Sequence, residues 1–208
     1  MTELHEREAV LAEPTWEFAR LFPAQGQWDE EDYFAIDTNQ LVEFSNGQLE
    51  VLEMPSITHQ LIALALFRLF DRWVEAHALG KVLLAPIKIQ LWPGKYREPD
   101  LLLILPHRLS RHTEQYWLGA DLVVEVISPG DRQRDTKTKR WEYAQAGIAE
   151  YWLVDPESQT ITVLTLAQTA VPPSYRVHGE FSAGQQATSC LLTEFVVDID
   201  RLFASTML

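Results

Sequence analysis

The sequence has a single cysteine, few glycines and no long apolar run, and each shortage excludes a class of protein. Cys190 is the only cysteine in 208 residues, which excludes an internal disulfide and a multi-cysteine metal site; a small buried residue is expected there. Nine glycines and 47% hydrophobic residues are typical of a packed domain and not of a disordered chain. The apolar run at residues 61–67 ends at Arg68, far short of the roughly 20 apolar residues of a membrane-spanning helix.

Basic residues are also scarce, since 17 Lys and Arg stand against 30 Asp and Glu, a net charge of −13. Affinity for nucleic acid comes mainly from cations that meet phosphates, so this balance argues against a protein that coats nucleic acid. A local basic site remains open, because one short stretch holds Arg132, Arg134, Lys137, Lys139 and Arg140. The acidic first ten residues lack the pattern of a secretory signal, and with the lone cysteine they favour the cytoplasm.

The apolar pattern predicts one domain with an appended N-terminal segment. Residues 1–35 are expected to form an extension that packs on the body through a short helix, and residues 36–208 to form a single domain. The dipeptide Asn46-Gly47 predicts a β-hairpin, because both residues tolerate positive φ. The N-terminal part is therefore expected to be helical and hairpin-like.

The rest of the chain alternates between helical and strand patterns. Apolar residues three and four apart predict a long helix over residues 56–77, capped by Ser56 or Thr58. A second helix is expected over residues 133–146, ending at Gly147. Strands are expected at residues 81–92, 96–105, 120–128, 150–155 and 161–166.

Two acids interrupt otherwise apolar strands. Asp100 stands directly before the run 101–105, and Glu125 lies inside the run VVEVI. Burial of an unpaired carboxylate costs several kcal/mol, so Glu125 needs a cation, hydrogen-bond donors or a metal beside it. Alternation places it on one strand face with Val123 and Ile127. If the two strands pair, Asp100 and Glu125 converge on one point.

The pair of carboxylates admits two interpretations. With the backbone carbonyl of Val126 they would form the hard oxygen site that Mg²⁺ prefers, and such an ion can hold a phosphate and activate a water molecule. Alternatively, Glu125 is a structural acid paired with a basic residue, and Asp100 is a turn residue after proline. The periodicity alone does not separate the two.

A lysine on the second helix favours the metal interpretation. Asp135, Lys139 and Tyr143 are spaced four apart and share one helix face, which would bring the Lys139 ammonium near the carboxylates. There it could stabilise developing negative charge. The alternative is an ordinary surface pair between Asp135 and Lys139, worth under about 0.5 kcal/mol.

Several segments in order resemble the Uma2 family of restriction endonucleases, within the PD-(D/E)XK nuclease superfamily. They are REPDLLLI, GADLVVEVISPG, the pattern D-x-x-x-K-x-x-x-Y-x-x-x-G from Asp135 to Gly147, and EYWLVDP. The upstream stretch VEFSNGQLEVLEMPSITHQ and the closing LLTEFVVDIDRLF are similar to the same family. The resemblance spans residue 20 to the end, and the ordered set carries it rather than any one motif.

The resemblance implies a PD-(D/E)XK core in the α/β (α+β) class, with a mixed central sheet flanked by helices and with Asp100 and Glu125 as metal ligands. The superfamily's lysine position holds Ile127 here, so Lys139 is expected to replace it; Lys137 points to another helix face. Residues that match supplementary positions are His59, Glu43 and Tyr143. For His59 and Glu43 a capping or core role is the alternative, and Tyr143 is expected to pack and hydrogen-bond beside Lys139.

The expected function is a Mg²⁺-dependent endonuclease that hydrolyses DNA, with Mn²⁺ as a substitute. Arg132, Arg134, Lys137 and Arg140 are expected to guide the DNA backbone, and a homodimer is expected because two sites cut two strands. One alternative is an inactive nuclease-like module that binds DNA or regulates. Another is a metal-independent carboxylate-pair hydrolase that acts on a glycoside.

Overall fold

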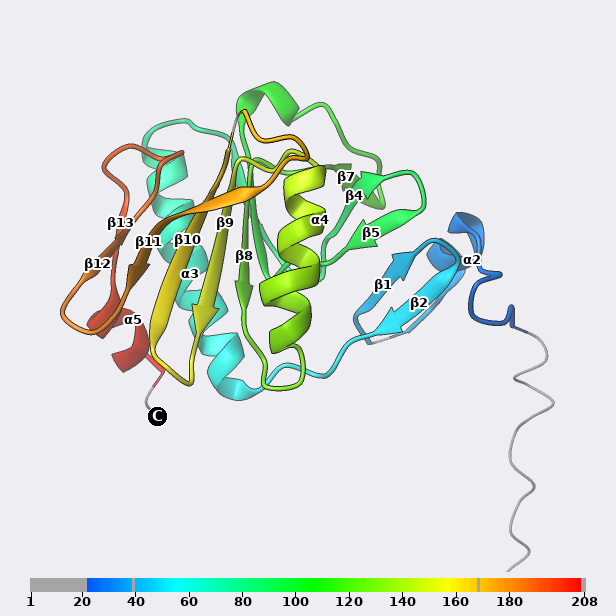
Figure 1. The fold of residues 1–208 in the computed structure, drawn as a ribbon, viewed down its shortest axis with the longest axis horizontal. Coiled ribbons are helices and arrows are strands. Elements are labelled where there is room, and N and C mark those ends of the chain that lie inside the picture. Colours follow the sequence, from blue (N-terminus) through cyan, green and yellow to red (C-terminus); the bar gives the residue numbers. More distant parts are fainter. Residues whose placement is uncertain (1–21, 39, 168, 207–208) are drawn as a thin grey trace, which may run out of the picture.

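Two β-sheets, of five and six strands, carry the fold, and helices cover them (Figure 1). The computed structural model describes residues 22–38, 40–167 and 169–206. The first sheet has the order β2-β1-β5-β4-β7; its strands are β1 (Val42–Ser45), β2 (Gln48–Val51), β4 (Lys88–Trp92), β5 (Lys95–Arg97) and β7 (Tyr116–Leu118).

The second sheet has six strands in the order β11-β10-β9-β8-β6-β3. Its strands are β3 (Lys81–Leu84), β6 (Leu101–Ile104), β8 (Leu122–Val126), β9 (Glu150–Asp155), β10 (Thr160–Leu166) and β11 (Tyr175–Phe181). A two-stranded sheet is formed by β12 (Gln186–Thr188) and β13 (Val196–Asp198). The helices are α2 (Glu30–Ala35), α3 (Ile57–Ala76), a 3₁₀ turn η1 (Pro106–Arg108), a π-helical segment η2 (Arg134–Lys139), α4 (Arg140–Gln145) and α5 (Ile199–Ala204).

The predicted fold class, a mixed sheet flanked by helices, is confirmed. The pairs β4–β7 and β8–β9 are parallel, and the other strand pairs of the two larger sheets are antiparallel. The expectation of one central sheet was incomplete, because the segment predicted as a strand over residues 96–105 splits into β5 and β6. Pro99 lacks the N–H that a continuous ladder needs, and the chain passes from one sheet to the other there. Asp100 therefore lies at the junction of the two sheets.

The N-terminal hairpin and the two predicted helices form as expected. Asn46 and Gly47 have φ values of 47° and 83°, as a tight hairpin turn requires. The Ser56 side chain accepts a 3.2 Å hydrogen bond from the His59 amide and caps α3. Of the expected extension, residues 1–21 lie outside the described residues, and α2 packs its Tyr33 against the first sheet.

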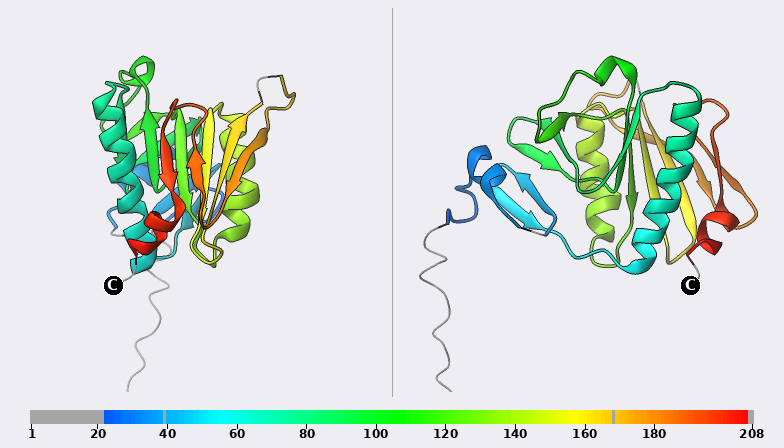
Figure 2. Two further views of the ribbon diagram at one scale, coloured as in Figure 1. Left: turned by 90° about the vertical axis from the view of Figure 1, so that its left-hand side faces the viewer. Right: turned by 180° about the vertical axis from the view of Figure 1, so that it is seen from behind.

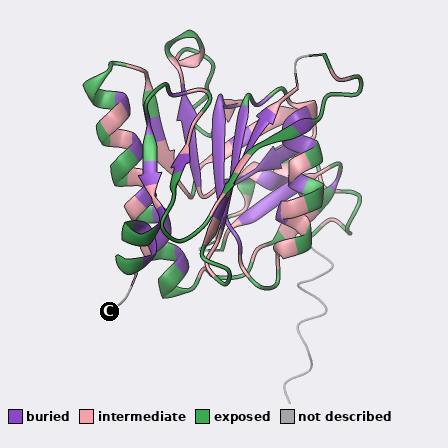
Figure 3. Ribbon diagram, turned by 60° about the vertical axis from the view of Figure 1, so that its left-hand side comes forward, coloured by how far each residue is buried: buried purple, intermediate pink, exposed green. Residues whose placement is uncertain are grey.

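Helices α3 and α4 cover opposite faces of the six-stranded sheet (Figure 2). On the α3 side, the Phe70 ring packs 5.3 Å from Trp152 and 4.4 Å from Phe195, centroid to centroid. The central strands are buried along their lengths (Figure 3), which explains their nearly continuous apolar sequences. Any charged side chain on β8 is thus enclosed.

No helix among the described residues has the length and apolar character needed to cross a membrane.

Candidate active site

Asp100 ties three elements together at the junction of the sheets. Its Oδ2 accepts a 2.7 Å hydrogen bond from the amide of Val126, at the end of β8. The same oxygen lies 3.1 Å from Nε2 of His59, in the first turn of α3. Although burial opposes it, contact with Asp100 raises the pKa of His59 above its ordinary value. Asp100 is therefore held in a defined position, next to a histidine that readily takes a proton.

Glu125 lies one residue before the end of β8 and is buried against η2 and α4. Its Oε1 accepts hydrogen bonds from Nζ of Lys139 at 2.8 Å and from the Tyr143 hydroxyl at 2.6 Å. Val123 and Ile127 belong to the same side of the sheet, as the alternation predicted. Tyr143 was expected to pack and hydrogen-bond beside Lys139, and both side chains donate to the same oxygen of Glu125.

The structure brings the two acids together. Leu101 pairs with Val124 across β6 and β8, so Asp100 and Glu125 come from adjacent positions in neighbouring strands. Both line one cavity of about 30 Å³, roughly the space of a single water molecule. The convergence predicted from strand pairing is present.

Lys139 is enclosed by three carboxylates. Nζ lies 2.8 Å from Glu125, 3.5 Å from Glu43 and 3.5 Å from Asp135. Burial disfavours the charged amine, but these three acids outweigh it and raise the pKa of Lys139. The ammonium is therefore a fixed, fully buried charge, and the surface-pair alternative for Lys139 was wrong.

Acids outnumber cations among the residues that line this cavity. We call this set of lining residues the carboxylate cluster. Its acidic lining residues are Glu53, Glu98, Asp100, Glu125, Asp131 and Asp135, and its full cations are Arg134 and Lys139. Burial raises the pKa of Glu125 to about 8, with Lys139 opposing the shift and neighbouring acids adding to it. The pKa of Asp135 is also raised, first by burial. Within the described residues, Oδ1 of Asp135 and Oε2 of Glu98 are buried without a hydrogen-bond partner.

This donor set fits a divalent cation of the Mg²⁺ type. The cluster has more carboxylates than cations, and some of the carboxylate oxygens accept no hydrogen bond. An added positive charge would stabilise these carboxylates. No group of three or more His, Cys, Asp or Glu side chains in the described part of the chain is arranged to hold a metal. Mg²⁺ needs fewer protein ligands, since it usually keeps several waters and binds through one or two carboxylates. Asp100 and Glu125, with the Val126 carbonyl, are the residues that would hold it.

Glu43 reaches the cluster from the first sheet and belongs to a buried ion network. Its carboxylate accepts from Nη1 of Arg97 at 2.6 Å and from the amide of Glu98 at 3.1 Å. Although burial alone would raise it, the charges of Lys139 and Arg97 lower the pKa of Glu43 to about 2. Arg97 also donates two hydrogen bonds to the carboxylate of Glu142 on α4, from Nε at 2.7 Å and from Nη2 at 2.9 Å. The network fixes the helix that carries Lys139.

Sequence reasoning missed Arg97 and Glu142 completely. Both are buried, with Arg97 only 1% exposed, yet each stands in a polar stretch without an apolar pattern. The one available signal was the spacing of Glu142, three residues after Lys139 and directly before Tyr143, on a helix already expected to face the acids.

Two arginines of the basic stretch are paired with acids. Arg132 pairs with Asp155 at 2.7 Å and with Glu157 at 2.8 Å. Arg134 pairs with Asp131 at 2.8 Å, and Arg140 donates to the carbonyl of Tyr175 at 3.3 Å. Lys137 is exposed and has no ion-pair partner among the described residues. Of the four expected DNA-backbone cations, Arg132 and Arg134 are thus paired with acids, whereas Lys137 and Arg140 have no acidic partner among the described residues.

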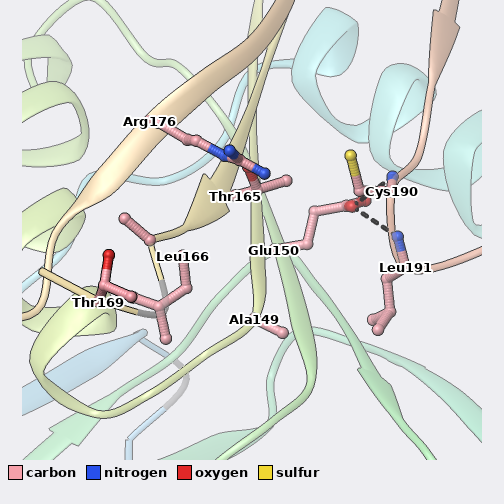
Figure 4. Close-up of a pocket in the computed structure, with 9 residues that line it drawn as sticks. Ala149, Glu150, Thr165, Leu166, Thr169, Arg176, Cys190 and Leu191 are labelled. Atoms are coloured by element: carbon pink, nitrogen blue, oxygen red, sulfur yellow. Dashed lines mark hydrogen bonds between the residues drawn. The ribbon is translucent and has the colours of Figure 1, made fainter.

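Cys190 and the remaining histidines lie away from the cluster. Cys190 is exposed, so the expected burial was wrong, and its Sγ lies 3.0 Å from Nδ1 of His178 on β11. It borders a cavity of about 520 Å³ beside Glu150 (Figure 4). The Glu150 carboxylate accepts from the amides of Cys190 and Leu191, which gives it a structural role.

Comparisons with known proteins identify the family of this chain. The sequence matches the profile of the Uma2 family, described as "putative restriction endonuclease", over residues 30–200. This chain belongs to the Uma2 family. The matched range holds every residue of the carboxylate cluster and the Arg97 network. The restriction-endonuclease resemblance found in the sequence is thereby confirmed.

A solved structure supports the fold of this Uma2 protein. It is similar to a crystal structure described as a "putative nuclease" of DUF820 from Anabaena variabilis, with a TM-score of 0.69 and 17% sequence identity. The match covers 85% of this chain and 98% of the other. At this identity the likeness shows the fold alone. No curated protein matches the sequence.

Proposed function

We propose that this Uma2 protein is a Mg²⁺-dependent endonuclease that hydrolyses phosphodiester bonds in DNA, with Mn²⁺ as a working substitute. The observation that carries the proposal is the meeting of Asp100, Glu125 and Lys139 at one cavity. The family description as restriction endonucleases supports a nuclease reaction. The proposed metal ligands are Asp100, Glu125 and the Val126 carbonyl.

Each side chain of the cluster has a role that follows from its contacts. When bound, the divalent ion would polarise a phosphate oxygen and make a water molecule more acidic. Lys139, fixed by Glu43 and Asp135, would stabilise the negative charge that develops on the phosphate. Tyr143 orients Glu125 through its 2.6 Å hydrogen bond. His59 holds Asp100 in place.

A nicking assay tests the proposal. Supercoiled plasmid is incubated with purified protein and Mn²⁺ or Mg²⁺, and conversion to open-circle and linear DNA is followed on gels. The variants Asp100→Asn, Glu125→Gln and Lys139→Met should lose at least about 100-fold in rate. Glu114→Gln, at an exposed acid in a loop, is the matched control and should cleave normally. Equal activity in all four variants would assign the nicking to a contaminant.

A second function has a specific observation in its favour. The Glu125 carboxylate is already paired with Lys139, and Asp100 with His59, as expected of an inactive module whose acids are structural. Calorimetry with Mn²⁺ separates the two. Absence of heat at millimolar Mn²⁺, together with DNA affinity that Glu125→Gln leaves unchanged, would favour the module. Hydrolysis of a glycoside substrate that EDTA leaves intact would point instead to the carboxylate-pair hydrolase.

Several partners form part of the same proposal. Lys137 is the exposed cation of the basic stretch and would contact the DNA backbone near the site, with Arg132, Arg134 and Arg140 as weaker contributors because of their present partners. A homodimer would place two sites on two strands; sedimentation analysis measures it. We also propose that the protein acts in the cytoplasm, where DNA, its proposed substrate, is accessible.

A further inference from the structure

A groove beside α3 gathers arginine side chains on this acidic protein. It has a volume of about 550 Å³ and lies between α3, the β12–β13 ribbon and α5. These elements are adjacent in the views from the side and from behind (Figure 2). The α3–α5 groove is lined by Arg68 and Arg72 of α3, Arg201 of α5, and the apolar Leu69 and Val196.

The three arginines of the groove are not neutralised. Arg68, Arg72 and Arg201 are exposed, and none forms an ion pair with any described residue. Asp198 also lines the groove, but its carboxylate caps α5 by accepting from the Arg201 amide. The groove therefore concentrates positive charge on a chain of net charge −13. In the basic stretch before α4, in contrast, Arg132 and Arg134 are paired with acids.

The spacing of the arginines suits a chain of phosphates. Arg68 and Arg72 are one helical turn apart, so their side chains leave the helix about 6 Å from each other. A guanidinium binds phosphate through two parallel hydrogen bonds. Leu69 and Val196, each 42% exposed, add apolar surface to the lining of the groove, against which the sugars of a nucleic acid can pack.

The groove is also within reach of the carboxylate cluster along one helix. His59, which contacts Asp100, lies 9 residues before Arg68 and 13 before Arg72. At 1.5 Å per residue these steps correspond to about 14 and 20 Å along α3. A DNA strand rises about 3.4 Å per nucleotide, so these separations along the helix axis correspond to about four and six nucleotides.

We propose that the α3–α5 groove binds the phosphodiester backbone of DNA several nucleotides away from the bond that is cleaved. The inference rests on the proposed function, since it takes DNA as the substrate. It adds a second DNA contact on the opposite flank of the sheet from η2 and α4.

The test is metal-free DNA binding, which separates affinity from cleavage. Fluorescence anisotropy with a labelled 20-base-pair duplex is measured in EDTA over a series of salt concentrations, with the full chain. Arg72→Gln should weaken binding about eightfold at 0.1 M salt, and the logarithmic salt slope should fall by about 0.9, the value for one phosphate contact. Arg68→Gln/Arg72→Gln should weaken it roughly 60-fold. Arg111→Gln, at an exposed arginine in the loop before β7, is the matched control and should bind normally.

Each other result overturns the inference. Equal losses in Arg72→Gln and Arg111→Gln would mean that only overall charge matters. Unchanged DNA affinity with a changed sedimentation coefficient in Arg72→Gln would identify the groove as a contact between two copies of the chain. A wild-type protein that does not bind the duplex would also refute it. The proposed function fails separately if the groove binds DNA but the protein does not cleave DNA with Mn²⁺. Normal cleavage by the wild-type protein, together with groove variants that keep the wild-type DNA affinity, refutes the groove proposal alone.

Discussion

Replacement of Arg97 with methionine should strongly destabilise the protein, although Arg97 lies outside the proposed metal site. The side chain is 1% exposed and contacts three carboxylates. Glu142 accepts two of its hydrogen bonds, and Glu43 and Glu50 accept one each. Methionine fills a similar volume without charge, so the substitution removes the cation and leaves the acids behind.

The magnitude follows from what remains around those acids. Removal of one partner of a buried ion pair costs about 3–5 kcal/mol, because the other charge is left uncompensated. Here Lys95 still contacts Glu142, and Lys139 still lies 3.5 Å from Glu43, which favours the lower end of that range. A loss of about 3 kcal/mol corresponds to a fall in Tm of about 6–12 °C for a chain of this size.

The assay is thermal and urea unfolding, with Arg132→Met as the matched control. Arg132 also pairs with two acids, but its side chain is 41% exposed, so its loss should cost under about 1 kcal/mol. The double variant Arg97→Met/Glu142→Gln should lose less than the sum of its single changes, because the uncompensated acid is gone. The reasoning is refuted if Arg97→Met costs no more than Arg132→Met.

Three further predictions concern the cluster and the fold. Because burial raises the pKa of Glu125 to about 8 from its ordinary 4.5, the metal-free native state holds a proton that the unfolded state loses, and stability should fall as pH rises from about 4.5 to 8. Glu125→Gln should flatten this profile, and it should also abolish the rise in Tm that bound Mn²⁺ is expected to cause in the wild-type protein. Phe70→Ala should cost about 3–5 kcal/mol in urea unfolding by opening a cavity, against under about 1 kcal/mol for the exposed Leu69→Ala. Gly80→Ala would bring a Cβ within 2.0 Å of a backbone oxygen at the end of β6, whereas Gly184→Ala, also at positive φ, meets nothing within 4 Å among the described residues; a difference in unfolding free energy of less than about 1 kcal/mol between them would contradict the steric argument.

The pairing of acids could be predicted because it depends on local periodicity. Glu125 stands out as a single charge in an apolar strand, and alternation fixes which face it occupies. A spacing of four does the same for Asp135, Lys139 and Tyr143 on the helix. Once β6 and β8 are neighbours, the contact with Asp100 follows from their register. Each step needs only short-range pattern plus one strand pairing.

The ion network and the state of the basic stretch could not be predicted, because their partners are distant in the chain. Arg97 finds Glu142 and Glu43 at separations of 45 and 54 residues, and no local pattern specifies such meetings. Arg132 is neutralised by Asp155, 23 residues away. Composition counts these charges correctly but does not say which remain available. For the same reason, the sequence did not indicate that the arginines of the α3–α5 groove are free of ion-pair partners among the described residues.

Glu125 and Glu150 show that the charge imbalance at the sheet junction is specific to that place. Both are carboxylates buried on central strands of one sheet. Glu150 is satisfied by four neutral donors, from Trp152, Ser189, Cys190 and Leu191, so its charge is dispersed without a counter-ion. Glu125 instead shares one ammonium with two other acids and lies beside buried oxygens that lack donors. The fold can therefore solvate a buried carboxylate fully and does so at the other end of the sheet. Native structures rarely keep unsatisfied groups without a reason, and a divalent cation would remove this imbalance at the position where cleavage is proposed.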